Sequence, residues 1–351
     1  MKLQLPAIAL VVISAFAPLI AFGQQRYNVT DLGELGGDFT GAYGVNDAGE
    51  VTGFSLTADR VIHAFLYKHG LMEDLGSLLD SSGESVGNSI NNRGWVTGDS
   101  SGGAFIFGRG EVRDLGAASS ATAINDRGEV TGTVSPAGQP GASHAFLYDH
   151  GVMTDLGTLP GGRFSAGTAI NSSGEIVGYA DNAAGETSAF LYRHGTLLPL
   201  NTPGGPESAG TSVGINDKGD VVGTYDATIS PFGTPFQTTE AFIRYRNGQV
   251  SALGFPMYGV QSFANAINNQ DVVVGAAVLL YPEGDQHAVI YANGVMTDLN
   301  DLIDPGLGIN LIEATAISDN GNIVANGDPN GGCCSWYHAY LLTPIYPSGP
   351  K

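Results

Sequence analysis

Four histidines recur at one position of a repeated pattern in this chain, and recurring histidines are candidate metal ligands. They stand before a short apolar run, as in "HAFLY", at His63, His144, His287 and His338. Gly103, Ser188 and Glu240 occupy the same position in other copies of the pattern, so no common ligand shell is repeated. We therefore expect these histidines to be structural, capping the start of a strand or hydrogen-bonding a neighbouring unit. We expect no metal and no cofactor.

Aspartates recur in a second pattern, "DLG" or "DLN", and carboxylates are hard oxygen ligands that calcium prefers. The positions are Asp31, Asp74, Asp114, Asp155 and Asp298. Aspartate beside glycine also ends strands by accepting hydrogen bonds from nearby backbone N–H groups, and we favour this interpretation. Paired carboxylates such as Asp47 with Glu50 lie in a repeated hairpin, so they do not single out the two facing carboxylates that a glycosidase needs.

Aromatic residues concentrate in the segments where the repeated units differ. These insertions run over 224–239, 276–286, 300–313 and 328–337 and read as irregular loops. Aromatic side chains exposed on one rim suit stacking on sugars or burial against a protein partner. They could equally pack against their own loops. The candidate ligand-binding residues are Tyr225, Phe232, Phe236, Tyr281, Trp336 and Tyr337.

The two cysteines, Cys333 and Cys334, are adjacent and lie in the last insertion. A disulfide between them would be strained, because neighbouring Cα atoms are only about 3.8 Å apart. Free thiols and cross-links to another chain are the alternatives. A metal site formed with His338 lacks an identifiable fourth ligand.

No familiar catalytic motif is present. The chain contains no GxSxG, HExxH, P-loop or dinucleotide-binding sequence. We assign no catalytic residue, and we expect a non-catalytic binding or scaffold protein rather than an enzyme, acting through the rim that carries the long insertions. The alternative is a carbohydrate-active hydrolase or lyase that draws acidic groups from separate units.

Seven repeated units must position these residues. Each unit is marked by an anchor residue, as in "AINDRGEVTG", and successive anchors are 34 to 52 residues apart, the range of a four-stranded propeller blade. The anchors are Asn46, Asn91, Asn125, Asn171, Asn216, Asn268 and Ser318. A single unit cannot bury its apolar faces, so the units should stack around one shared core.

Within a unit, small residues two and four positions before the anchor alternate with other residues, as expected for a strand near a crowded axis. Glycine stands three residues after six of the seven anchors, where a hairpin turn requires a left-handed residue, and Asp271 replaces it in the sixth unit. A second strand such as "EVTG" follows. "HAFLY" and "MTDLG" are the third and fourth strands.

The ends of the chain indicate how the ring closes. The seventh unit stops after its third strand, whereas "YNVTDLG" at 27–33 is a fourth strand without the three before it. We predict an all-β, seven-bladed propeller in which this N-terminal strand pairs with the strand that starts at His338. Both variable connections of every unit then open on the same rim.

"HAFLY", "MTDLGTLPGG" and "AINSSGEIVG" resemble the HAF repeat proteins, a bacterial family of extracellular repeats. The resemblance covers nearly the whole chain after its N-terminal segment. It implies export and a repeated β architecture, and it brings no established activity.

Composition and the N-terminus agree with an exported protein. An apolar run from Leu5 to Phe22 follows Lys2, so we expect a signal peptide at 1–23, one propeller domain at 24–343 and a tail at 344–351. The net charge of −20 argues against a nucleic-acid partner. We expect a secreted or periplasmic monomer without a membrane span after cleavage. Its predicted partner is a glycan or a cell-surface protein.

Overall fold

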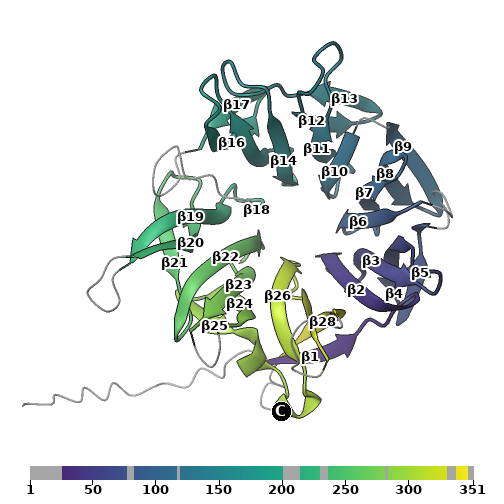
Figure 1. Cartoon of the computed structure of the whole chain (residues 1–351), viewed down its shortest axis with the longest axis vertical. Coiled ribbons are helices and arrows are strands. Elements are labelled where there is room, and N and C mark those ends of the chain that lie inside the picture. The colour runs from purple at the N-terminus through teal and green to yellow at the C-terminus, as the bar shows by residue number, and fades with distance from the viewer. Residues whose placement is uncertain are drawn as a thin grey trace, which may run out of the picture.

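The computed structural model describes residues 26–76, 83–116, 119–200, 214–229, 236–280, 284–329 and 337–346, without the side chains of Ile229 and Phe236. These residues form seven antiparallel sheets of four strands, arranged as blades around a central axis (Figure 1). The prediction of a seven-bladed β-propeller is confirmed. No helix among the described segments is long and apolar enough to cross a membrane.

The strands occupy equivalent places in every blade. The innermost strands are β2 (Gly36–Val45), β6 (Ser85–Ile90), β10 (Ser119–Ile124), β14 (Ser165–Ile170), β18 (Gly214–Ile215), β22 (Gly259–Ile267) and β26 (Asn310–Ile317). The second strands are β3 (Val51–Thr57), β7 (Val96–Ser100), β11 (Val130–Val134), β15 (Ile176–Asp181), β19 (Val221–Ile229), β23 (Val273–Leu279) and β27 (Ile323–Asp328).

The outer two strands complete each blade. The third strands are β4 (Ile62–Lys68), β8 (Gly103–Gly108), β12 (His144–Asp149), β16 (Thr187–Arg193), β20 (Phe236–Arg244), β24 (Gln286–Ala292) and β28 (His338–Ile345). The outermost strands are β5 (Leu71–Asp74), β9 (Glu111–Gly116), β13 (Val152–Asp155), β17 (Thr196–Pro199), β21 (Val250–Gly254), β25 (Val295–Asp298) and β1 (Arg26–Asp31).

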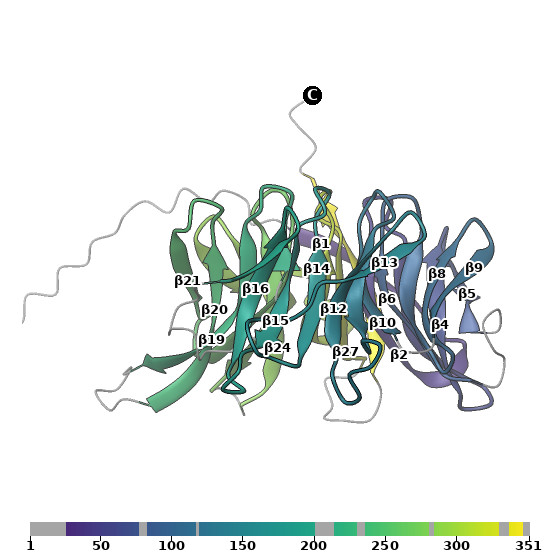
Figure 2. The same cartoon turned by 90° about the horizontal axis from the view of Figure 1, so that it is seen from above.

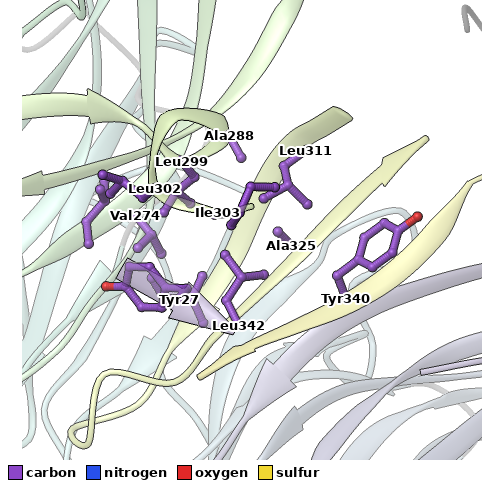
Figure 3. Packing of buried hydrophobic residues seen from close by; sticks show 13 residues of the cluster. Tyr27, Val274, Ala288, Leu299, Leu302, Ile303, Leu311, Ala325, Tyr340 and Leu342 are labelled. Carbon is purple, nitrogen blue, oxygen red and sulfur yellow. The ribbon is translucent and has the colours of Figure 1, made fainter. Parts of the chain in front are cut away.

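The N-terminal strand closes the ring as predicted. β1 pairs antiparallel with β28, from Arg26 opposite Ile345 to Asp31 opposite Tyr340. Tyr27 of β1 is buried beside Leu342 and against residues of the sixth blade, including Leu299 and Leu302 of the 3₁₀ helix η1 (Leu299–Leu302) (Figure 3). A second 3₁₀ turn, η2 (Pro305–Leu307), follows. Closure therefore joins the last two blades through buried apolar contacts as well as backbone hydrogen bonds.

The turn after each anchor residue has the predicted left-handed residue. Gly49 has a φ of 76°, and Asp271, which replaces glycine in the sixth blade, has a φ of 62°. Asp271 therefore keeps the turn at the conformational cost that a side chain imposes there. We call the rim formed by these turns, at 46–49 and the equivalent residues, the turn rim.

The innermost strand carries a feature that simple alternation did not predict. In six blades its register shifts between the two small residues, as between Ala42 and Gly44, so the residue between them is bulged. The bulged residues are Tyr43, Asn88, Thr122, Thr168, Asn265 and Thr315. The bulge also moves a carbonyl over the second strand: a β-carbon on Gly53 would overlap the oxygen of Gly41, which explains the glycine in "EVTG".

The expectation that the insertion at 224–239 is irregular was wrong. β19 and β20 stay paired out to Ile229 opposite Phe236, forming a long hairpin at the rim opposite the turn rim (Figure 2). Continued pairing satisfies backbone groups that an open loop would leave to water. The insertion at 300–313 likewise contains η1, η2 and the start of β26. We call this opposite rim, where second strands connect to third strands, the long-loop rim.

Candidate functional site

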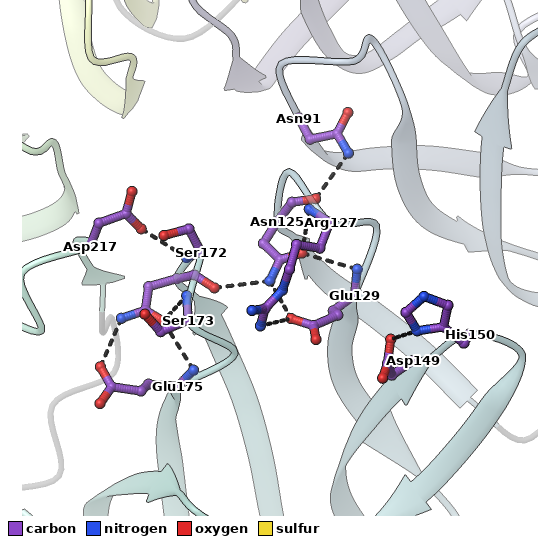
Figure 4. A network of polar contacts seen from close by, with 11 residues as sticks. Asn91, Asn125, Arg127, Glu129, Asp149, His150, Ser172, Ser173, Glu175 and Asp217 are labelled. Carbon is purple, nitrogen blue, oxygen red and sulfur yellow. Dashed lines mark hydrogen bonds and ion pairs between the residues drawn. The ribbon is translucent and has the colours of Figure 1, made fainter.

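The anchor asparagines link the blades around the central channel. The Nδ2 of Asn91 donates to the backbone oxygen of Asn125 at 2.9 Å, and Asn125 donates in the same way to Asn171 (Figure 4). Equivalent bonds join Asn46 to Asn91, Asn171 to Asn216, Asn216 to Asn268 and Asn268 to Ser318. At the junction between the seventh and first blades the anchor is Ser318, and serine cannot donate an amide N–H. There the side chain of Asn322 donates to the backbone oxygen of Asp47 instead. The repeated asparagine is thus a structural connector.

The residue after each anchor lines a small hollow at the turn-rim end of the channel, with a volume of about 210 Å³. These residues are Asp47, Asn92, Asp126, Ser172, Asp217, Asn269 and Asp319. They bond one another around the ring; for example, Asn269 donates its side-chain N–H to both Asp217 and Asp319. Burial alone would raise the pKa of Asp217, but hydrogen bonds from Ser172 and Asn269 outweigh it and lower that pKa. The carboxylates therefore have internal partners.

The "HAF" histidines and the "DLG" aspartates form pairs. In each of four blades a histidine Nδ1 lies 2.5–3.1 Å from an aspartate oxygen of the adjacent strand. The pairs are His63 with Asp74, His144 with Asp155, His287 with Asp298 and His338 with Asp31. The Asp298 hydrogen bond raises the pKa of His287 above its usual value. No three His, Cys, Asp or Glu side chains of the described residues gather as metal ligands.

Two of the six predicted ligand-binding aromatics have described side chains, and they do not lie together. Tyr225 stays within its own blade, where its hydroxyl donates to Glu240 at 2.6 Å and its ring packs edge-on against Phe242. Burial and Glu240 raise its pKa. Phe236 begins β20, but its side chain lies outside the described residues. Phe232, Tyr281 and Trp336, like Cys333 and Cys334, also lie outside them.

Tyr337 joins an aromatic cluster on the long-loop rim that the sequence did not reveal. Its ring stacks on Phe39 at a centroid distance of 5.6 Å, and its backbone oxygen accepts from the N–H of Thr40. Phe39 packs against Phe54, and Phe54 packs against Tyr43. Burial raises the pKa of Tyr337 to about 12. We call Phe39, Tyr43, Phe54 and Tyr337 the aromatic cluster.

A hollow of about 460 Å³ opens beside this cluster at the channel wall. It is lined by Tyr43, Val86, Asn88, Asp99 and Thr122. Phe39 and Tyr43 remain 37% and 41% exposed, so the aromatic cluster presents ring surface next to polar groups. Such a combination can stack against a sugar ring and accept or donate hydrogen bonds to its hydroxyls.

Tyr43 departs from a structural rule that four of the five other bulged residues follow. Thr122, Thr315, Asn88 and Asn265 each donate to a backbone oxygen of the next blade, for example Thr315 to Ala42 at 2.8 Å. The Tyr43 hydroxyl has no such bond within the described residues. The sequence contains an indication of this difference, because Tyr43 is the one aromatic residue among the six bulged positions. Those positions, however, are identified only from the register of the paired strands.

Comparison with known proteins identifies the fold and no family. No protein-family model and no curated protein matches the chain. Among solved structures, a catalytically inactive virginiamycin B lyase from Staphylococcus aureus is 11% identical over 91% of this chain and 100% of that chain, with a TM-score of 0.52.

Two further solved structures are similar to the same degree. A streptogramin B lyase is 10% identical over 91% of this chain and 98% of its own, with a TM-score of 0.51. The β-propeller domain of the Trilobed protease from Pyrococcus furiosus is 11% identical over 76% of this chain and 85% of that chain, also with a TM-score of 0.51. At such identities the likeness shows a shared propeller fold alone.

Proposed function

We propose that this protein is a non-catalytic binding module that engages a glycan through the long-loop rim, at the aromatic cluster and the hollow beside it. Tyr43 carries the proposal, because a position that serves blade-to-blade hydrogen bonding elsewhere holds a part-exposed aromatic side chain here. Local departures from a structural rule concentrate at functional sites.

The polar lining of the hollow supports a hydroxylated ligand. Asp99 accepts hydrogen bonds from the Asn88 side chain and from Ser120, so its carboxylate is held in place at the wall of the hollow. Fixed polar groups beside ring surface favour a ligand with many hydroxyls over a purely apolar one.

The experiment that tests this proposal is retention of a panel of neutral and acidic polysaccharides on the immobilised protein, with reducing ends assayed in parallel. We expect retention without new reducing ends. Tyr43→Thr restores the residue type of other blades, so it should keep the fold and reduce retention at least tenfold. Tyr346→Thr, an exposed tyrosine near the turn rim, is the matched control and should retain glycans normally.

Two outcomes would overturn the proposal. Reproducible new reducing ends would favour the hydrolase or lyase alternative. Equal retention by the Tyr43→Thr variant and the parent would remove the aromatic cluster from the binding surface.

We also propose export and membership of the HAF repeat family, on the N-terminal apolar run and the repeated motifs. Expression of the full chain in a bacterial host tests the first point. The exported protein should begin at Gln24, as determined by N-terminal sequencing, and recovery of an intact N-terminus only in the cytoplasm would contradict export.

A further inference from the structure

A groove on the turn rim between the second and third blades gathers positive charge in an otherwise acidic protein. This groove, which we call the blade 2–3 groove, has a volume of about 480 Å³. Four of the 14 lysines and arginines of the chain line it: Arg93, Arg109, Arg113 and Arg127. The protein carries a net charge of −20, so a cavity lined by four arginines contrasts with the charge of the molecule as a whole.

Trp95 forms the wall of the groove. It stands four residues after its anchor, where four other blades have Glu50, Glu129, Glu175 and Asp220. Its indole fits closely between two glycines: a β-carbon at Gly108 or Gly128 would lie 2.7 or 2.8 Å from a ring carbon. The guanidinium carbons of Arg93 and Arg109 lie 5.6 and 5.7 Å from the ring centroid. The second blade therefore replaces an internal carboxylate by an aromatic ring that orients two arginines.

Three of these arginines have no anionic partner in the part of the chain that the structure describes. Arg127 pairs with Glu129, but no carboxylate of the described residues lies within 4.0 Å of a side-chain nitrogen of Arg93, Arg109 or Arg113. Arg113 donates to the hydroxyl of Tyr148 at 3.3 Å. The groove thus contains guanidinium N–H donors that no carboxylate of the described residues neutralises. Guanidinium groups bind planar carboxylates with two parallel hydrogen bonds.

The rest of the lining restricts the ligand. Glu111 and Asp149 also face the groove, and Asp149 contacts His150. These carboxylates would repel a second negative charge and would accept hydrogen bonds from hydroxyl groups. The charge of the whole protein repels extended polyanions as well. A compact ligand with one carboxylate and several hydroxyls satisfies both sets of groups.

We propose that the blade 2–3 groove binds a sugar acid, with its carboxylate at Arg93 and Arg109 and its hydroxyls toward Glu111, Asp149 and Tyr148. This site lies on the rim opposite the proposed glycan surface, so either proposal can be contradicted without affecting the other. Tyr43→Thr is expected to leave sugar-acid binding unchanged.

Tryptophan fluorescence tests the proposal directly. The chain has two tryptophans, so the Trp336→Phe variant makes Trp95 the sole reporter. Titration with D-glucuronate should change its emission saturably, and raising NaCl from 50 to 500 mM should weaken binding severalfold, because the arginines are exposed to screening ions. D-glucose should produce no saturable change. Absence of a saturable response to glucuronate, or an equal response to glucose, would overturn the proposal.

Arginine variants in the same background locate the site. Arg93→Gln and Arg109→Gln should each weaken glucuronate binding about tenfold or more, as expected for loss of a charge-assisted bond. Arg193→Gln, in the equivalent groove between the fourth and fifth blades, is the matched control and should bind normally. Circular dichroism verifies that all variants are folded. Equal weakening by Arg193→Gln would show only general electrostatics and would contradict the assignment.

Two further experiments test which chemical class of ligand the groove binds. Inorganic phosphate and sulfate should bind at least tenfold more weakly than glucuronate, since they lack the hydroxyl pattern; equal affinity would refute a sugar-acid site. Trp95→Glu places an internal carboxylate beside Arg93 and should abolish glucuronate binding measured by calorimetry. Retained binding in that variant would contradict the role of the free guanidinium groups.

Discussion

Two grooves on the turn rim occupy equivalent places in the propeller and differ in what fills them. The blade 2–3 groove is about 480 Å³ in volume, and its counterpart between the fourth and fifth blades is about 100 Å³. Residues at equivalent positions of the repeated unit line the two grooves: Trp95 is equivalent to Glu175, Gly108 to Arg193 and Tyr148 to Arg244. The same backbone therefore supports a large cavity in one place and a much smaller one in the other.

The blade 4–5 groove is filled by an internal ion pair. Glu175 has a side chain only 8% exposed, and it accepts two hydrogen bonds from Arg246, at 3.1 and 3.2 Å, and one from Asn171. Arg246 is thus neutralised by the protein itself, whereas Arg193 and Arg244, which also line this groove, make no ion pair within the described residues. Where Trp95 replaces the acid, the arginines stay available to a ligand. The residue four positions after the anchor thus decides whether the groove contains an internal carboxylate that can pair with an arginine.

Trp95→Ala should have the largest effect on stability. The free energy of unfolding should fall by about 2–3 kcal/mol, because the variant loses the packing of a half-buried ring against the turns of two blades. Equilibrium urea denaturation measures the change, and Trp95→Phe should lose less. A loss below about 0.5 kcal/mol would mean that the indole does not help to join the blades.

Gly108→Ala tests the close approach of Trp95. The added methyl group would overlap the indole, so we expect a loss of about 1–2 kcal/mol. Other blades hold Lys68, Asp149 and Arg193 at this position, so the same change in a Trp95→Ala background should cost almost nothing. A double-mutant cycle measures this coupling, and additive effects would contradict it.

Glu175→Gln tests the ion pair of the blade 4–5 groove. We expect a loss of about 1 kcal/mol, because charged hydrogen bonds to the half-exposed Arg246 are weakened. The loss should shrink in 0.5 M NaCl, which screens the native pair. Glu186→Gln, in an exposed loop where Glu186 bonds Asn182, is the control. An equal loss there would assign the effect to overall charge.

Arg93→Gln and Arg109→Gln should have the smallest effects on stability. Each should change the free energy of unfolding by less than about 0.5 kcal/mol, since these exposed arginines make no ion pair within the described residues. Arg246→Gln should cost about 1 kcal/mol in the same assay. A loss above 1 kcal/mol at Arg93 would indicate that it holds blades together, and the contrast between the grooves would fail.

The repeated sequence was sufficient to predict the four strands of each blade, the turns and the closure, but not the extension of β19 and β20 into the insertion at 224–239. The local features that determine a blade are the small residues before each anchor and, in six of the seven units, a glycine three residues after it. The strand at 27–33, which has no partners beside it in the sequence, indicates how the last blade is completed. The bulge at Tyr43 and its equivalents was not predicted, because a two-residue periodicity gives no sign of one extra residue. Its discovery depended on the register of paired strands.

The residues that form the candidate sites were harder to predict from the sequence than the fold. Tyr337 was named as a candidate, but its partner Phe39 lies at the other end of the chain and becomes a neighbour only through closure of the ring. The arginines around Trp95 fall between residues 93 and 127, yet they come from two blades: Arg93, Arg109 and Arg127 from turns, and Arg113 from the outermost strand β9. Nothing in their spacing shows that they share a cavity.

The sequence by itself determined a seven-bladed propeller. Each unit contains its own strand periodicity and turn residues, and it needs neighbouring units to bury its apolar faces. The tertiary structure decided which side chains of neighbouring blades meet. The His63–Asp74 pair, the asparagine connections and the open groove beside Trp95 all arise between strands or blades. Their chemistry depends on distances that a repeat pattern along one chain does not specify.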